Sequence, residues 1–189
     1  GALSKQAEEW VLLTTARENG KLRGYVFSTL ERIGGTPSVI MGLGAVIRNN
    51  KRNTALRSLM SELYHRALMA FPDEDVIFGT TIVTPSGFEI FKDLSDELPK
   101  PSYRPSGEER AWGRRFAKRL GFSQLGFDDK KFVAIGDGSK PCIFDYESLK
   151  PEKISKDISD MFLGLDHENG DAIIAVAWAM AEKLEKLGS

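Results

Sequence analysis

The stretch AVIRNNKRNTALRSLM, residues 45–60, places four cations after an apolar run with no acidic residue between them: Arg48, Lys51, Arg52 and Arg57. This order predicts a strand that ends in a basic turn and leads directly into a helix. The first N–H groups of a helix have no intrahelical partner and the helix dipole is positive there, so such a junction binds phosphate groups. An ordinary connection between a strand and a helix, with solvated cations, is the alternative.

The residues around this junction have the periodicities of strands and of one helix. Runs rich in β-formers at residues 10–16, 22–33 and 38–47 are separated by turn sequences at residues 18–20 and 34–37, which predicts an antiparallel meander. From residue 54 to Phe71 apolar residues recur every three or four positions, which predicts a helix that packs one face on the sheet. The apolar run at residues 75–84 predicts a central strand, parallel to the third strand through a right-handed crossover.

The rest of the chain is expected to be mainly helical. Residues 86–94 are typical of a helix, and the proline-rich residues 98–105 are typical of an exposed loop. A second helix is predicted at residues 106–120, because Ser106 and Glu109 have capping-box spacing and Gly121 suits the position after a helix. A short strand at residues 132–135 precedes helices at residues 155–163 and 170–187, the last from the spacing of its apolar residues.

Composition restricts the class of protein. A chain of 189 residues with 41% hydrophobic and 28% charged residues is expected to form one globular domain, or one domain with an appendage. The net charge of -1 disfavours extensive nucleic-acid coating, and no run reaches the roughly 20 apolar residues of a membrane span. Cys142 has no second cysteine to pair with, which favours the cytoplasm. The two histidines, His65 and His167, do not make a metal site.

The order of these elements resembles the Gcn5-related N-acetyltransferase (GNAT) superfamily. NGKLRGYV at residues 19–26 is similar to the second and third strands of that family, and residues 45–60 are similar to its fourth strand, acyl-CoA loop and following helix. TPSGFEIF at residues 84–91 and RLGF at residues 119–122 are similar to the opening and the close of the next helix. The resemblance implies an α/β (α+β) fold: a mixed, mainly antiparallel sheet with a splayed parallel pair over residues 10–135, and a C-terminal helical extension at residues 136–187.

The resemblance also implies a function, an N-acyltransferase that moves an acetyl group from acetyl-CoA, or a related acyl-CoA, to an amine. The parallel strands are expected to part after Val46, with pantetheine pairing like an extra strand to the backbone of residues 43–47. A backbone N–H near Val46 is expected to hold the oxyanion. The resemblance implies that the donor binds at these residues, without a metal: Val46, Ile47, Arg48, Lys51, Arg52, Asn53, Thr54, Ala55 and Leu56.

Several positions depart from the family pattern. Thr54 and Leu56 stand where the family has glycines that let the backbone approach the diphosphate. The tyrosine acid of the family corresponds to Phe91 or to Ala117, and its first strand and two helices are expected before Trp10. Glu31 is the candidate base and Tyr103 a candidate acid on a loop over the site. The alternatives are a surface carboxylate paired with a neighbouring cation and a loop anchor.

A second hypothesis is therefore kept open, a GNAT-fold protein without ordinary CoA use that binds nucleic acid or a protein partner. The second predicted helix interleaves cations with aromatic residues, which could form such a surface: Arg110, Arg114, Arg115, Lys118 and Arg119, with Trp112 and Phe116. A solvated basic face is the alternative. The apolar face of residues 170–187 is expected to be core or the surface of a homodimer.

Overall fold

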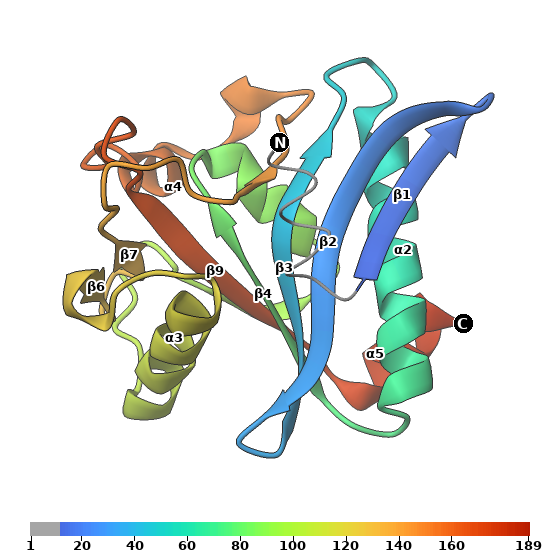
Figure 1. Ribbon diagram of the computed structural model, residues 1–189, viewed down its shortest axis with the longest axis horizontal. Coiled ribbons are helices and arrows are strands. Elements are labelled where there is room, and N and C mark those ends of the chain that lie inside the picture. The colour runs from blue at the N-terminus through green and yellow to red at the C-terminus, as the bar shows by residue number, and fades with distance from the viewer. Residues whose placement is uncertain (1–11) are drawn as a thin grey trace.

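The structure, a computed structural model, describes residues 12–189 as a mixed α/β fold built on one open, mostly antiparallel sheet. The sheet has nine strands in the order β1-β2-β3-β4-β9-β7-β6, with β5 added to β9 and β8 added to β3. Figure 1 shows the strands crossing the centre of the molecule, with α2 and α5 together on one side and α3 away from them beside β6 and β7. The strand bounds are β1 Leu12–Glu18, β2 Lys21–Ile33, β3 Thr36–Val46, β4 Val76–Ile82, β5 Ser95–Leu98, β6 Phe127–Asp128, β7 Val133–Ala134, β8 Phe144–Asp145 and β9 Ala172–Ala179.

The predicted antiparallel meander is confirmed in β1, β2 and β3. The turn between β1 and β2 uses Asn19 at φ 51° and Gly20 at φ 77°, the left-handed conformations that a tight hairpin turn requires. Residues 10 and 11 of the first predicted strand lie outside the described residues.

The predicted helix after the basic turn is also confirmed as α2, Arg52–Ala70. Its buried residues, among them Leu59 and Leu63, belong to a core cluster that includes Val39, Met41 and Phe78 of β3 and β4. Strand β4 runs parallel to β3, as the intervening helix predicted, and all seven of its residues are buried. Because neighbouring residues of a strand point to opposite faces, a strand buried throughout must be covered on both sides.

The second face of the sheet is covered by α3, Gly107–Arg119, which begins with the predicted capping box of Ser106 and Glu109. Its Trp112 and Phe116 form a second core cluster with Ile40 of β3 and Ile77 of β4. Helix α3 approaches β4 closely at Gly79, where a Cβ atom would lie 2.2 Å from Phe116 Cδ1.

The helix predicted at residues 170–187 is wrong for most of its length. Residues 172–179 are strand β9, which lies between β4 and β7, and only Ala181–Gly188 forms a helix, α5. The sequence AIIAVAWA is apolar throughout, so it satisfies a helical spacing as well as a strand buried on both faces, and its Ile and Val favour the strand. Residues 136–187, expected to pack on the domain as an extension, thus contribute β8 and β9 to the same sheet.

The remaining elements are short. Residues 85–91 form a 3-10 helix, η1 Pro85–Phe91, where a helix was predicted, and α4 spans Lys156–Asp160. Two further 3-10 turns, η2 Gln124–Gly126 and η3 Pro151–Lys153, join the C-terminal elements. Among residues 12–189, no helix is both long enough and apolar enough to cross a bilayer.

Candidate functional site

Strands β3 and β4 form a parallel pair that separates halfway along its length. They pair only where Ser38, Val39 and Ile40 face residues 77–79, although β3 continues to Val46 and β4 to Ile82. Where the pairing ends, the Thr80 hydroxyl donates a hydrogen bond to the Met41 carbonyl, with 2.8 Å between the oxygens. The two strands therefore diverge beyond Ile40 and Gly79. We call the space between their unpaired parts the donor groove, because a pantetheine strand was expected there.

The donor groove is filled by the chain itself. Strand β8 pairs in parallel with β3, placing Phe144 opposite Gly44 and Asp145 opposite Ala45. The Gly44 N–H donates to the Ile143 carbonyl across 3.0 Å. The backbone that was expected to pair with pantetheine is thus paired with residues 143–145.

Two aromatic side chains, Phe144 and Tyr146, anchor residues 143–148 in the core. Phe144 and Tyr146 are each only 1% exposed and belong to the same core cluster as α2. The Tyr146 hydroxyl donates a hydrogen bond to Asn53 Oδ1 in the first turn of α2. Burial, followed by the nearby Glu89 carboxylate, raises the pKa of Tyr146 to about 12. The phenol is therefore neutral near pH 7 and remains a hydrogen-bond donor.

The cations of the basic turn are paired with groups of the chain. Arg48 Nη2 lies 3.2 Å from Asp145 Oδ1, and its Nε lies 3.0 Å from Glu147 Oε2. Arg52 donates from Nη1 to the Glu147 carbonyl across 3.1 Å. Lys51 Nζ lies 2.6 Å from Glu18 Oε1, and this hydrogen bond holds the pKa of Glu18 below its usual value. Asp145 of β8, Glu147 just after it and Glu18 of β1 therefore supply the anionic groups that a diphosphate was expected to bring.

Backbone N–H groups at the start of α2 are also engaged. Lys51 N–H donates to Asn49 Oδ1 across 2.9 Å, and Thr54 N–H donates to the Lys51 carbonyl across 3.0 Å. Ala55 and Leu56, which were expected near the diphosphate, are buried in the core. The Ile47 N–H donates to the Arg23 carbonyl of β2 across 2.8 Å, so this N–H faces away from the donor groove.

No protein-family model, curated protein or solved structure matches the chain.

Glu31, the expected base, does not lie beside the opening of the donor groove. It faces Ser38 in the register of β2 and β3, at the end where β3 and β4 are still paired. Its carboxylate accepts two hydrogen bonds from the Arg119 guanidinium of α3, with 2.7 Å between Arg119 Nε and Glu31 Oε1. The register places Glu31 before the strands separate, away from the expected position of a base. Its pairing with Arg119 matches the alternative interpretation, a carboxylate paired with a neighbouring cation.

Tyr103, the candidate acid, lies on the proline-rich loop before α3. Its hydroxyl donates to Glu109 Oε1 across 2.6 Å, and the Lys100 ammonium lies 4.8 Å from the centre of its ring. The hydrogen bond to Glu109 raises the pKa of Tyr103, with smaller contributions from burial and nearby carboxylates. The hydroxyl is thus tied to the capping carboxylate of α3, which favours the interpretation of Tyr103 as a loop anchor.

Three of the five cations on the basic face of α3 are in ion pairs. Arg110 and Arg114 both pair with Asp129, at 3.0 and 2.5 Å, and Arg119 pairs with Glu31. Arg115 lies over the Trp112 ring, 4.7 Å from its centre. Cations that are already paired release fewer counterions on binding a phosphate backbone.

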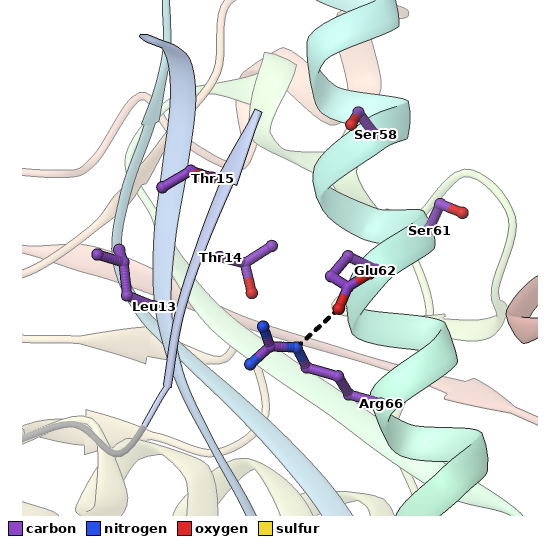
Figure 2. A pocket seen from close by; sticks show the side chains of 7 residues that line it. All are labelled: Leu13, Thr14, Thr15, Ser58, Ser61, Glu62 and Arg66. Atoms are coloured by element: carbon purple, nitrogen blue, oxygen red, sulfur yellow. Dashed lines mark hydrogen bonds and ion pairs between the residues drawn. The ribbon is translucent and has the colours of Figure 1, made fainter. Parts of the chain in front are cut away.

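A separate pocket of about 420 Å³ lies between β1 and α2. Figure 2 shows its polar lining, in which Arg66 donates to Glu62 across 3.0 Å on α2. Thr14 of β1 also lines it, and its buried hydroxyl has no hydrogen-bond partner among residues 12–189. This pocket contains no pairing of a nucleophile with a base. Across the described residues, no group of three metal-ligating side chains comes together.

The residues that sequence reasoning missed are those of the segment 143–148, IFDYES. Its signal was the alternation of two aromatic residues with two acids, Phe144, Asp145, Tyr146 and Glu147, which is a strand pattern with charges that complement the basic turn. A second missed residue is Glu97 of β5, where burial raises the carboxyl pKa to about 7.

Proposed function

We propose that this chain is a GNAT-like domain in which the protein's own residues 143–148 take the place of acyl-CoA, and that it works as a binding module rather than as an acyltransferase. The single observation that carries this proposal is the pairing of β8 with Gly44 and Ala45 inside the donor groove. Acetyl-CoA does not fit the residues present, because both its strand-like arm and its diphosphate would meet occupied positions.

The energetic cost of opening the donor groove supports permanent occupation. Exposing a buried aromatic side chain costs about 1.5–3 kcal/mol, so releasing Phe144 and Tyr146 costs about 3–6 kcal/mol before any hydrogen bond is counted. A ligand that binds only the open form has its affinity reduced by the fraction of open molecules, here about 10²- to 10⁴-fold. A donor site with a Kd of about 1 μM would thereby weaken to a Kd of about 0.1–10 mM.

The remaining surfaces favour a small ligand or a protein over nucleic acid as the partner. Three of the five cations proposed for a nucleic-acid surface, Arg110, Arg114 and Arg119, are in ion pairs with Asp129 and Glu31. Opening these pairs would offset part of the gain from phosphate contacts. Oligonucleotide binding is therefore the less favoured form of this proposal.

The test is a thermal-shift titration with acetyl-CoA, using ATP as a control that carries a similar polyphosphate without pantetheine. We expect no stabilisation at millimolar acetyl-CoA beyond that given by ATP. A ligand present at 100 times its Kd would add about 2.7 kcal/mol to the free energy of unfolding, which is easily detected. A concentration-dependent shift with acetyl-CoA alone would overturn the proposal.

Acyl-CoA-dependent N-acyl transfer is the second candidate, and one observation favours it. The parallel strands do part beyond Ile40, and the Arg48 and Lys51 side chains at the end of β3 remain 57% and 63% exposed. A donor could reach these two cations if residues 143–148 left their place.

The double variant Asp145→Asn/Glu147→Gln separates the two candidates. It removes the charges that pair with Arg48 while keeping the shape of both side chains. If the second candidate is correct, acetyl-CoA will stabilise this variant more strongly than the native chain. The matched control is Asp160→Asn, which removes an exposed ion pair with Lys156 elsewhere in the molecule.

A further inference from the structure

A groove on the other side of β9 from the donor groove is larger than the pocket between β1 and α2 and than a third cavity beside Gly121 and Gly170. It has a volume of about 960 Å³, against about 420 and 480 Å³ for the other two. Its walls come from the proline-rich loop at residues 99–105, from residues 128–135 and from residues 157–165. We call it the proline-loop groove. Its volume is at the upper end of the roughly 300–1,000 Å³ that is usual for small-molecule sites.

The lining of this groove includes a set of apolar side chains. Val133 of β7 and Met161 after α4 are half-buried and pack against the main core cluster, and Leu165 is buried. Ile135 also lines the groove and is 48% exposed, so its side chain is available for contact. Covering such residues with an apolar ligand is favourable by about 25 cal/mol for each Å² removed from water.

The same groove carries four exposed cations, Lys100, Arg104, Lys130 and Lys131. None of them takes part in the ion pairs found among residues 12–189. Lys100 is positioned by its contact with the Tyr103 ring. The cations come from two different segments, the proline-rich loop and the turn before β7, so they are brought together by the fold and not by a run in the sequence.

Three carboxylates also line the groove, but two of them are already engaged. Asp128 Oδ1 accepts the backbone N–H groups of Lys130 and Lys131, at 2.9 and 3.2 Å. Asp160 pairs with Lys156 across 2.8 Å. Asp128 keeps its charge, so it and Asp157, in the first turn of α4, stand against the four cations. The groove therefore presents an excess of positive charge next to an apolar surface.

We propose that the proline-loop groove binds a small amphipathic anion, an apolar chain or ring that carries a carboxylate or a phosphate group. The apolar part would contact Val133, Ile135 and Met161, and the anionic head would lie among the lysines and Arg104. The inference uses residues outside the donor groove and does not depend on the proposed function. A donor groove that binds acetyl-CoA would overturn the proposed function and leave this site unaffected.

The test is isothermal titration calorimetry of the full chain with four probes. Octyl phosphate and octanoate carry both features, octyltrimethylammonium carries the same chain with the opposite charge, and inorganic phosphate carries charge alone. We expect binding of at least one of the two anionic octyl probes, weakened by added salt because the cations are exposed. Comparing these two probes distinguishes a phosphate ester from a carboxylate as the head group.

Two variants locate the site. Lys130→Glu/Lys131→Glu reverses charge on the rim, and Ile135→Glu places a charge on the apolar surface; both alter exposed side chains, so the fold is retained. Each is expected to weaken binding of the anionic octyl probe at least tenfold. The matched controls are Lys150→Glu/Lys153→Glu and Leu125→Glu, at exposed positions outside the groove, which should bind as the native chain does.

The proposal is overturned by any of three results. The first is no binding of either anionic octyl probe up to about 5 mM. The second is equal affinity for octyltrimethylammonium, which would indicate non-specific apolar contact. The third is a rim variant that binds as tightly as its control, which would place the ligand elsewhere.

Discussion

Glu97 is a half-buried carboxyl on β5, and burial raises its pKa to about 7, against a smaller lowering effect of Lys100. The folded chain therefore holds this proton more tightly than the unfolded chain, in which the group has its usual pKa of 4.5. As pH rises from about 4.5 to about 7, the unfolded state loses the proton first, so the free energy of unfolding falls across this window. Below about pH 4.5 the carboxyl is neutral in both states, so its burial lowers the free energy of unfolding only slightly.

Replacing Glu97 with Gln removes this titration. We expect the variant to be more stable than the native chain at pH 8, by about 1–2 kcal/mol after allowing for partial solvent exposure, and to differ little at pH 4.5. Urea denaturation at the two pH values measures the difference. Glu168→Gln, in an exposed loop, is the control. An equal effect of Glu97→Gln at both pH values would contradict the argument.

At the scale of elements, β8 has only two residues, and its buried Phe144 side chain holds it in the core. Phe144 lies against Gly44, where an added Cβ would be 3.1 Å from Phe144 Cδ1, and it packs in the same core cluster as Phe88 and Phe162. The close contact between the Gly44 backbone and the Phe144 ring keeps β8 against β3. Helix α2, in turn, is covered partly by residues that come almost a hundred positions later in the chain.

We expect Phe144→Ala to lower the free energy of unfolding by about 3–5 kcal/mol, because it leaves a cavity between the sheet and α2. Leu163→Ala is the control, since Leu163 is 79% exposed and its truncation should cost little. Denaturant unfolding of both variants gives the comparison. A loss below about 1 kcal/mol for Phe144→Ala would mean that β8 is not part of the core.

The elements with strong local signals were predictable from the sequence, and the others were not. The capping box of Ser106 and Glu109 and the apolar stripe of α2 depend on neighbours within one turn, so α3 and α2 were predicted within two residues of their observed starts. Strand β9 was read as a helix because a fully apolar run carries no period of its own. Strand β8 is defined by a partner a hundred residues away, which local patterns do not contain.

The candidate site shows the same division. The sequence predicted that cations would gather at the end of β3, and they do. It did not predict that Asp145 and Glu147 would neutralise Arg48, because this pairing follows from the return of the chain into the donor groove. Glu31 was misplaced for a related reason, since its distance from the opening depends on the strand register rather than on its own neighbours.

At the scale of the whole molecule, β3 and β4 diverge, and β8 of the same chain fills the gap between them. A cavity of about 960 Å³ lies elsewhere, beside β7 and α4. The central claim is therefore that residues 143–148 belong to the folded core and are not displaced by a donor.

Amide hydrogen exchange at Gly44 tests that claim most directly, because its N–H donates to the Ile143 carbonyl only while β8 is in place. We expect this amide to exchange as slowly as those of the central strand β4, with no change in millimolar acetyl-CoA. Fast exchange at Gly44 while β4 stays protected, or a change in its exchange on adding acetyl-CoA, would contradict the account.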